Sequence, residues 1–341
     1  MGLQKLIVRT LMKLPESWIL KLAGGTPVEI DGRTMDPRIQ LLAAQGAKAP
    51  SMTSMSIEDA RKSADEGLAL LDAKPRRTVS ILSRTIPGPA GDLHVRIYTP
   101  AGATGPLPGI VYYHMGGCVI GNLETCNTFC SILADDCRAI VVSVDYRLAP
   151  EHKFPAAMDD AVASFDWVSE NAAALGIDPT RLGVGGDSAG GWLSAVVCQT
   201  RKAEGKTQPK AQLLIYPATD LDAKEGSMQS CAEIYPLTAE IMDWFMQQFL
   251  NSPEDAKDLK ASPAHSEDLS GLAPALIMTA GFDVLRDQGE AYGNRLRDAG
   301  VPVTYRCYDS LSHAYTAFSG AVPAARQACE EIARDMARAL G

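Results

Sequence analysis

The sequence lacks a Cys-x-x-Cys pair, an excess of basic residues and a long uninterrupted apolar run. Its eight cysteines are scattered, and several lie in apolar segments as reduced core residues do, so we expect no metal centre and favour reduced cysteines over a disulfide framework, which a core of this size does not need. Lysine and arginine number 32 against 41 aspartate and glutamate residues, which gives a formal net charge of −9. A polyanion binder needs a basic face, so we expect no nucleic acid or anionic membrane as a partner.

The N-terminal segment, residues 1–25, also lacks the apolar stretch of a signal peptide or a membrane span. Lys5, Arg9, Lys13 and Lys21 interrupt its apolar residues, which recur at helical spacing. We therefore expect an amphipathic helix, a cytoplasmic location and no integral membrane association. The apolar face has two interpretations: a cap packed over an active site, which we favour, or a surface that touches lipid aggregates.

Strand-like and helix-like segments alternate through the rest of the chain. Two antiparallel strands are predicted at residues 78–86 and 93–98, joined by a Pro- and Gly-rich turn. Further strands are predicted near residues 109–113, 139–145, 182–185, 212–216, 275–280 and 303–308. This pattern predicts an α/β fold with a mainly parallel sheet and helices on both faces. With 341 residues, of which 46% are hydrophobic, the chain can form one large core plus an accessory element.

A Gly-x-Ser-x-Gly motif stands at residues 186–190, between a strand-like run and a helix start rich in small residues. A serine hydroxyl is a weak nucleophile, so a catalytic serine is presented on a sharp strand-to-helix turn within reach of a base. Gly186 and Gly190 flank that turn, where a side chain would collide with the neighbouring backbone. This setting predicts a nucleophile at Ser188 rather than an ordinary glycine-rich turn.

A second glycine motif, His-Met-Gly-Gly, follows the strand-like run at residues 109–113. Acyl transfer needs donors aimed at the oxygen that becomes negative, and adjacent glycines let main-chain N–H groups point into a cleft. Gly116 and Gly117 fit that role, and the N–H of Ala189 would be the third donor. The loop by itself is typical of an ordinary turn, so this interpretation depends on Ser188.

A catalytic triad also needs an acid and a base, and after a Gly-x-Ser-x-Gly serine the chain order is acid, then histidine. Of the five histidines, only His265 and His313 follow Ser188. We select His313, because it follows a strand-like segment and a short loop, whereas His265 lies in a polar turn. Asp283 is the best candidate for the acid, because it follows a buried strand directly, and catalytic groups gather at the carboxyl ends of parallel strands. Asp220, which follows an equally good strand, is the runner-up.

These separated motifs resemble those of the hormone-sensitive-lipase family of α/β-hydrolases, in the bacterial family IV branch that carries Gly-Asp-Ser-Ala-Gly. The resemblance covers most of the chain and rests on residues 114–117, 145–151, 154–157 and 186–191, with Asp283, Leu285, Arg286, Asp287 and His313. One departure is Met115, which stands where the family usually has a glycine and affects the loop's backbone freedom and the acyl-pocket wall. Arg147 and Glu151 are interpreted as residues that fix a turn.

The resemblance implies an α/β-hydrolase fold with a helical cap and the activity of a carboxylesterase of lipid metabolism. Short- to medium-chain carboxylic esters would be hydrolysed through an acyl-enzyme on Ser188, with His313 as general base and acid and Asp283 orienting it. The oxyanion hole would consist of the N–H groups of Gly116, Gly117 and Ala189. Neither a cofactor nor a metal is expected. A non-catalytic small-ligand-binding protein, an amidase and a lactonase stay open as alternatives.

The cap is predicted in two parts. The first is residues 1–55, and the second is an aromatic-rich segment at about 219–250 within the catalytic domain, residues 56–341. We expect an apolar face of the first part to pack against Trp244 and Phe245; the face consists of Leu3, Leu6, Leu11, Leu14 and Trp18. Such a wall favours soluble esters with acyl chains of about four to eight carbons. The partner is then a small-molecule ester, and a homodimer stays open.

Because no cluster of His, Cys or Asp has metal-ligand spacing, we expect a chelator to leave ester hydrolysis unchanged. The measurement is the rate of hydrolysis of a p-nitrophenyl ester before and after treatment with EDTA. A loss of activity that a divalent cation restores would contradict the metal-free mechanism.

Overall fold

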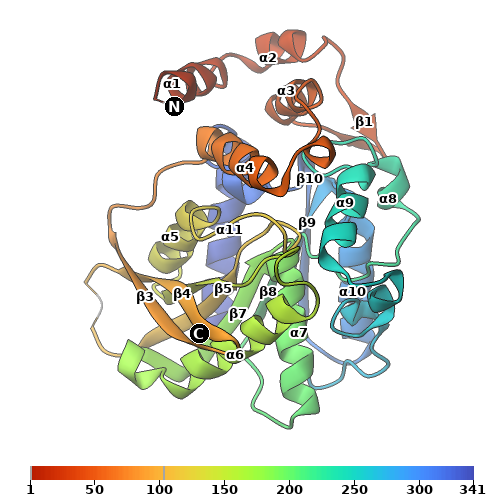
Figure 1. The fold of residues 1–341 in the computed structure, drawn as a ribbon. Coiled ribbons are helices and arrows are strands. Elements are labelled where there is room, and N and C mark those ends of the chain that lie inside the picture. The colour runs from red at the N-terminus through yellow and green to blue at the C-terminus, as the bar shows by residue number, and fades with distance from the viewer. Residues whose placement is uncertain (1, 103) are drawn as a thin grey trace.

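The computed structural model describes residues 2–102 and 104–341 (Figure 1). Within these residues the main sheet has the strand order β10-β9-β8-β7-β5-β6-β4-β3. Its strands are β3 (Val79–Gly88), β4 (Gly91–Pro100), β5 (Leu107–Tyr113), β6 (Ile140–Asp145), β7 (Ile177–Asp187), β8 (Gln212–Ile215), β9 (Ala275–Phe282) and β10 (Val303–Ser312). The pairs β3/β4 and β4/β6 are antiparallel, and the other neighbouring pairs are parallel. The predicted α/β class and mainly parallel sheet are confirmed.

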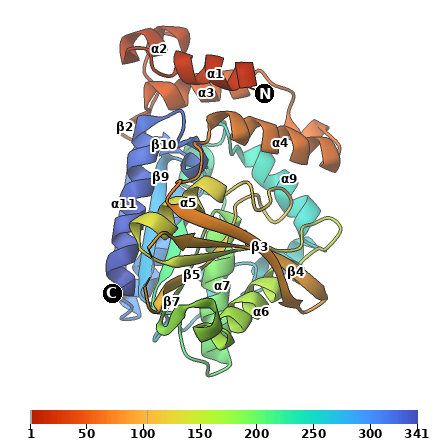
Figure 2. The ribbon, with the colours of Figure 1, turned by 90° about the vertical axis from the view of Figure 1, so that its left-hand side faces the viewer.

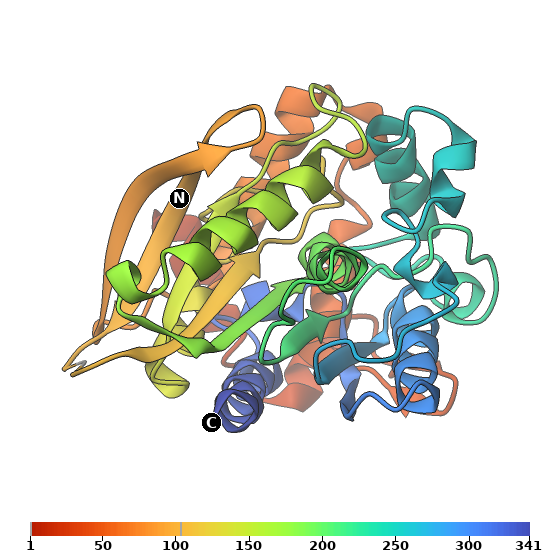
Figure 3. The same cartoon turned by 90° about the horizontal axis from the view of Figure 1, so that it is seen from below.

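Helices cover both faces of the sheet because its central strands are apolar on both sides. In β5, Ile110 and Tyr112 enter one apolar cluster and Val111 and Tyr113 enter the other, as the two-residue period of a strand requires. One layer of helices consists of α6 (Ala156–Glu170), α7 (Ala189–Ala203) and α10 (Arg286–Asp298), and the other of α5 (Asn127–Asp136) and α11 (Pro323–Leu340). Figure 3 shows the lime-coloured α6 and the dark blue α11 on opposite sides of the strands.

A further group of helices lies beyond one end of the sheet (Figures 1 and 2). It contains α3 (Pro37–Gly46), α4 (Ile57–Leu71) and α9 (Ala239–Phe249). Asp36, Ser56 and Thr238 start these three helices, because each side chain accepts a main-chain N–H bond from the first turn. The short elements of the fold are β1 (Glu29–Ile30), β2 (Arg33–Thr34), η1 (Met52–Ser54), η2 (Ala173–Leu175), α8 (Ser227–Ser230), η3 (Pro253–Lys257), η4 (Pro263–His265) and η5 (Tyr315–Phe318).

Two separate helices form the N-terminal segment. Helix α1 (Gly2–Leu11) ends before Pro15 and α2 (Glu16–Leu22) begins after it, so the predicted apolar face is divided between two short helices. Met12 and Ile19 are buried and anchor these helices in an apolar cluster shared with α3. Across residues 2–102 and 104–341, the helices are all too short or too polar to cross a bilayer.

The predicted packing of this N-terminal face against the aromatic residues of α9 is wrong. Leu6 and Trp18 are each 62% exposed, because the break between the two helices leaves them on outer surfaces. Leu11 and Leu14 are half-buried, but they pack against one apolar cluster of the core, whereas Trp244 and Phe245 belong to the other. The side chain of Leu3 lies outside the part that the structure describes.

Asp72 joins three parts of the fold at the end of α4. Its Oδ1 accepts hydrogen bonds from the hydroxyl of Ser319, at 2.9 Å, and from the N–H of Ala73, at 2.8 Å. Its main-chain carbonyl accepts a bond from the guanidinium of Arg9 on α1. Burial raises the pKa of the Asp72 carboxyl to about 6. This junction therefore ties α1 and α4 to the segment that follows η5.

The variant Asp72→Asn tests the cost of charging this buried carboxyl. Folding raises its pKa from 3.8 to about 6, so the native state favours the protonated form. The stabilisation from protonation is complete below the unfolded value and is lost as the pH rises through the folded value. We therefore expect wild type to lose up to about 3 kcal/mol of unfolding free energy relative to Asp72→Asn across this interval.

The measurement is urea unfolding of both proteins at several pH values on either side of the interval. The exposed Asp222→Asn is the control and should follow wild type throughout. Parallel pH profiles for wild type and Asp72→Asn would contradict the assignment.

Candidate active site

Ser188 stands on a strained turn between β7 and α7. Its backbone angles are φ 55° and ψ −118°, a left-handed conformation that non-glycine residues rarely adopt. The N–H of Ser188 donates to the carbonyl of Ile215 in β8 at 2.8 Å. A Cβ at Gly190 would lie 1.9 Å from the carbonyl oxygen of Tyr113, and one at Gly186 would lie 2.5 Å from the same oxygen. Only glycine fits at the positions two residues before and two residues after the serine.

The structure brings Ser188, His313 and Asp283 together at the carboxyl ends of β7, β9 and β10. His313 Nε2 lies 2.9 Å from Ser188 Oγ, and His313 Nδ1 lies 2.7 Å from Asp283 Oδ2. Asp283 Oδ1 accepts the N–H of Leu285 at 2.9 Å, which fixes the carboxylate. All three side chains are buried, so solvent competes little for these hydrogen bonds. The arrangement suits proton transfer from the serine to the imidazole.

The two rejected candidates are placed elsewhere. His265 Nε2 lies 3.0 Å from Asp220 Oδ1, and both side chains are about one-third exposed. The runner-up acid therefore pairs with the rejected histidine and not with His313.

The glycines of the predicted oxyanion loop have the backbone that their role requires. Gly116 and Gly117 have φ values of 126° and 60°, and a Cβ at Gly116 would lie 2.1 Å from the carbonyl oxygen of Ile120. Among the described residues, neither N–H donates to a protein acceptor. Both glycines line the same cavity as Ser188 and Ala189. Their N–H groups are therefore free to bind a ligand oxygen.

The unusual Met115 fits this loop without strain. Its backbone lies outside the left-handed region, so the position does not need glycine. The side chain is buried and forms part of the cavity wall. The adjacent His114 stacks on Tyr146 with ring centroids 4.3 Å apart, and the Tyr146 hydroxyl donates to the His114 carbonyl at 2.7 Å. Burial lowers the pKa of His114 to about 4, so this ring stays neutral and supports the loop.

Comparison with protein families assigns this arrangement. Residues 110–317, more than half of the chain, match the family described as having the alpha/beta hydrolase fold. This chain belongs to the α/β-hydrolase family. The match spans both glycine motifs, Asp283 and His313.

Relatives of this hydrolase include esterases of known structure. Carboxylic ester hydrolase LipN of Mycobacterium tuberculosis is 42% identical over 303 residues, which cover 86% of this chain and 80% of that protein. Ethyl acetate hydrolase of Pseudomonas putida is 37% identical, with coverage of 81% and 88%. The ester hydrolase EH1AB1 from the Lake Arreo metagenome, complexed with a derivative of bipyridine phosphonate, is 41% identical with a TM-score of 0.84, covering 88% of this chain and 96% of that chain. The predicted hormone-sensitive-lipase type of esterase is confirmed.

Asp187 supports the histidine of the site, a role that the sequence analysis missed. Its Oδ2 accepts hydrogen bonds from the hydroxyls of Tyr216, at 3.0 Å, and Thr316, at 2.8 Å. The Tyr216 ring packs on the His313 ring, with centroids 4.6 Å apart. Burial raises the pKa of Asp187, and the hydroxyl donors oppose that rise. The only signal in the sequence was an acidic residue directly before the nucleophile.

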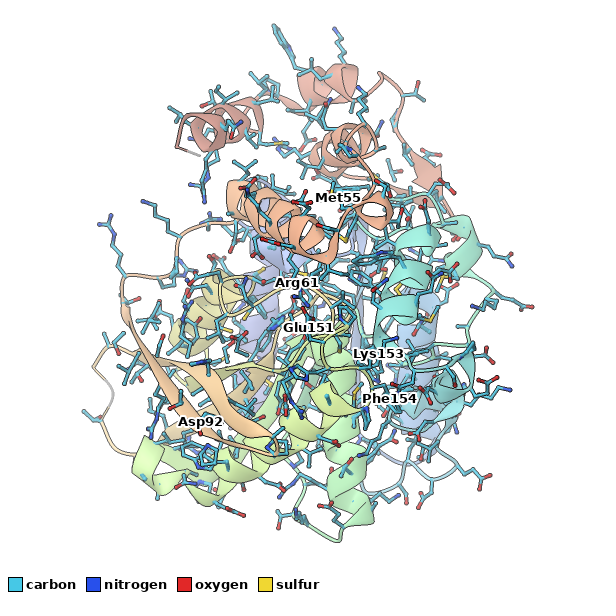
Figure 4. All side chains as sticks on the ribbon, in the orientation of Figure 1. Met55, Arg61, Asp92, Glu151, Lys153 and Phe154 are labelled. Carbon is cyan, nitrogen blue, oxygen red and sulfur yellow. The ribbon has the colours of Figure 1, made fainter. Side chains whose placement is uncertain are left out.

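Arg61 on α4 connects the N-terminal helices to the oxyanion loop. Its guanidinium donates to the carbonyls of Val119 and Ala149, each at 2.9 Å, and pairs with Glu151 at 2.7 Å. Figure 4 shows Arg61 and Glu151 close together below α4. The structural interpretation of Glu151 is thus confirmed, and so is that of Arg147, which pairs with a buried carboxylate on α6 at 2.7 Å.

The loop between β6 and α6, which carries Arg147 and Glu151, also contacts the end of α9. Lys153 donates to the carbonyl of Leu250 at 2.9 Å, just after the last turn of the helix. The N–H of Phe154 donates to the carbonyl of Phe249 at 2.9 Å, and the two rings pack with centroids 5.9 Å apart.

A cavity of about 640 Å³ opens above Ser188. Its lining is mainly apolar and comes from the N-terminal helices, the oxyanion loop and α9; examples are Val8, Leu41, Leu68, Met115, Ile241 and Phe245. The described residues contain no cluster of three or more His, Cys, Asp and Glu side chains suited to hold a metal ion. The cavity therefore offers mainly apolar surface for a substrate, with Ser188 and His313 at its base and a few polar side chains, such as Gln45 and Glu240, in the segments above it.

The variant Arg61→Ala tests the link between α4 and the oxyanion loop. Loss of the bond to Val119 should loosen the segment that carries Gly116 and Gly117, and we expect kcat to fall about tenfold with a smaller change in KM. The control is Arg38→Ala, because Arg38 also binds main-chain carbonyls and a glutamate but lies among the N-terminal helices. Equal losses of kcat in the two variants would show that Arg61 contributes stability alone.

Proposed function

We propose that Ser188 is the nucleophile, His313 the general base and acid, and Asp283 the orienting carboxylate of a serine carboxylesterase. The observation that carries this proposal is the pair of hydrogen bonds at the His313 ring, in which Nε2 accepts from Ser188 Oγ at 2.9 Å and Nδ1 donates to Asp283 Oδ2 at 2.7 Å. A buried aspartate on Nδ1 keeps the proton there and leaves Nε2 free to accept the serine proton.

The reaction would proceed in two steps. Ser188 Oγ attacks the ester carbonyl carbon while its proton passes to His313, and His313 then protonates the leaving alcohol as the acyl-enzyme forms. Water, deprotonated by the same imidazole, then attacks the acyl-enzyme; the bond between the acyl carbon and Ser188 Oγ breaks, His313 returns the proton to Oγ, and the acid is released. The proposed oxyanion donors are the N–H groups of Gly116, Gly117 and Ala189.

Ester hydrolysis is the activity class of this chain, which is a carboxylic ester hydrolase. The name of one relative, an ethyl acetate hydrolase, supports esters with small groups as substrates. The apolar cavity favours an acyl chain over a charged group, and we propose short- to medium-chain acyl groups of about four to eight carbons. Amides and lactones would use the same nucleophile, so they are the comparison substrates.

We propose further that residues 1–55 and 219–250 act together as the cap of this esterase. Both segments contribute apolar side chains to the cavity, among them Leu11 and Leu41 from the first and Ile241 and Phe245 from the second. Helix α4, between the first segment and the sheet, contributes Leu68. Substrate length would thus be selected by cap residues and not by the sheet.

Substitution of the triad tests the proposed roles. Ser188→Ala, His313→Ala and Asp283→Asn should each lower kcat by roughly 10⁴ to 10⁶-fold, and double variants should lose little more. The matched control is Asp220→Asn, a carboxylate at the end of a neighbouring strand that pairs with His265. Its kcat should stay close to that of wild type.

The assay is hydrolysis of p-nitrophenyl esters of graded acyl length, with an anilide and a lactone as comparison substrates. A greater loss for Asp220→Asn than for Asp283→Asn would reverse the assignment of the acid. Wild type that hydrolyses none of these esters would favour the alternative of a non-catalytic ligand-binding protein.

A further inference from the structure

The exposed apolar side chains of this protein gather on α1 and α2. The described residues contain eight large apolar side chains that are exposed, and four of them fall within residues 6–22. These four are Leu6 (62% exposed), Ile7 (57%), Trp18 (62%) and Leu22 (54%). Large apolar side chains exposed on two consecutive helices are costly in water and point to a contact surface.

The helices that carry this cluster form the outermost layer of the molecule. Figures 1 and 2 show α1 and α2 at one end, beyond α3 and α4. Arg38 on α3 donates to the carbonyl of Met12 at 2.8 Å, and Lys5 on α1 donates to the carbonyl of Ala69 on α4 at 2.5 Å. The buried Met12 and Ile19 hold the inner side. These contacts fix α1 and α2 on the rest of the protein and leave their outer side exposed to solvent.

Charge on this segment is opposite to that of the rest of the protein. Residues 1–25 contain four basic side chains and one acidic side chain, so they carry +3, and the remaining residues must carry −12 to give the total of −9. The one acid, Glu16, is paired with Arg38 at 3.2 Å. Lys13 and Lys21 are exposed. The total charge argued against anionic surfaces, but the exposed Lys13 and Lys21 place positive charge on the same segment as the exposed apolar side chains, while Lys5 and Arg9 bond to main-chain carbonyls at the end of α4.

We propose that the α1–α2 face, defined by Leu6, Ile7, Trp18 and Leu22 with Lys13 and Lys21, binds the surface of an anionic lipid bilayer. Amphipathic helices with Trp and Leu on one side and lysines beside them lie in the headgroup region, where the apolar side chains insert and the lysines meet anionic headgroups. A second copy of this chain is disfavoured, because a symmetric contact would bring two segments of the same positive sign, each with Lys13 and Lys21 exposed, against each other. The acidic body would face away from the lipid.

Binding in this orientation would bring the cavity close to the bilayer. Val8, Leu11 and Met12, from the same segment, line the cavity above Ser188. An apolar ester dissolved in the membrane would then reach the cavity without crossing bulk water. This proposal concerns where the protein works and does not depend on which ester it hydrolyses.

Vesicle co-sedimentation tests the proposal on the full-length chain. Wild type should bind vesicles of phosphatidylglycerol and phosphatidylcholine, bind pure phosphatidylcholine at least tenfold more weakly, and be released by high salt. The double variant Trp18→Ser/Leu22→Ser should bind the anionic vesicles at least tenfold more weakly, and so should Lys13→Glu/Lys21→Glu. The matched control is Ile81→Ser/Leu82→Ser, which removes two exposed apolar side chains from the distant strand β3 and should bind as wild type does.

Each variant is also assayed on a water-soluble short ester, because Trp18, Leu22, Lys13 and Lys21 line no part of the cavity. Unchanged hydrolysis shows that the variant is folded and separates this proposal from the catalytic one. Absence of wild-type binding to anionic vesicles, or equal binding by Trp18→Ser/Leu22→Ser, overturns the proposal. A wild-type dimer that this double variant converts to a monomer, measured by light scattering, overturns it in favour of a contact between two copies.

Discussion

The carbonyl oxygen at the end of β5 is the constraint around which the site is built. Tyr113 places this oxygen where the Cβ atoms of Gly186 and Gly190 would otherwise lie, so β7 and α7 can approach β5 only through glycine. The close approach forces the sharp turn at Ser188 and gives it a positive φ. Because the oxyanion loop leaves β5 directly after Tyr113, the same contact also sets the distance between the serine and that loop.

The strain at this turn is held by hydrogen bonds on both sides. The N–H of Ser188 donates to β8, while Asp187, just before it, accepts two hydroxyl donors, one of them from Tyr216. Tyr216 itself packs on His313. The nucleophile and the base are thus supported by neighbouring atoms of one buried network, which keeps their separation fixed while the proton moves between them.

The sequence predicted the parts of this molecule that follow local rules. The strand alternation, the Gly-x-Ser-x-Gly turn and the choice of His313 depend on chain order and backbone geometry, which short motifs record. The position of the N-terminal face was wrong, because the helical spacing of apolar residues continues across Pro15 and so predicts one helix, whereas the proline separates two. Arg61 and Asp187 were also missed as supporting residues, since their partners lie far away in sequence and only folding brings them together.

One loop, between β6 and α6, contacts both α4 and α9, two of the helices that line the cavity. Glu151 binds Arg61 on α4, while Lys153 and Phe154 hold the end of α9. The same loop binds the oxyanion segment, because the N–H of Ala149 donates to the carbonyl of Cys118 at 2.8 Å. The two helices and the oxyanion segment are thus held by the same loop. A substrate that displaces α4 or α9 on its way to Ser188 would therefore also disturb the loop that holds the oxyanion N–H groups. Entry of the substrate and stabilisation of its transition state would thus be coupled through one loop.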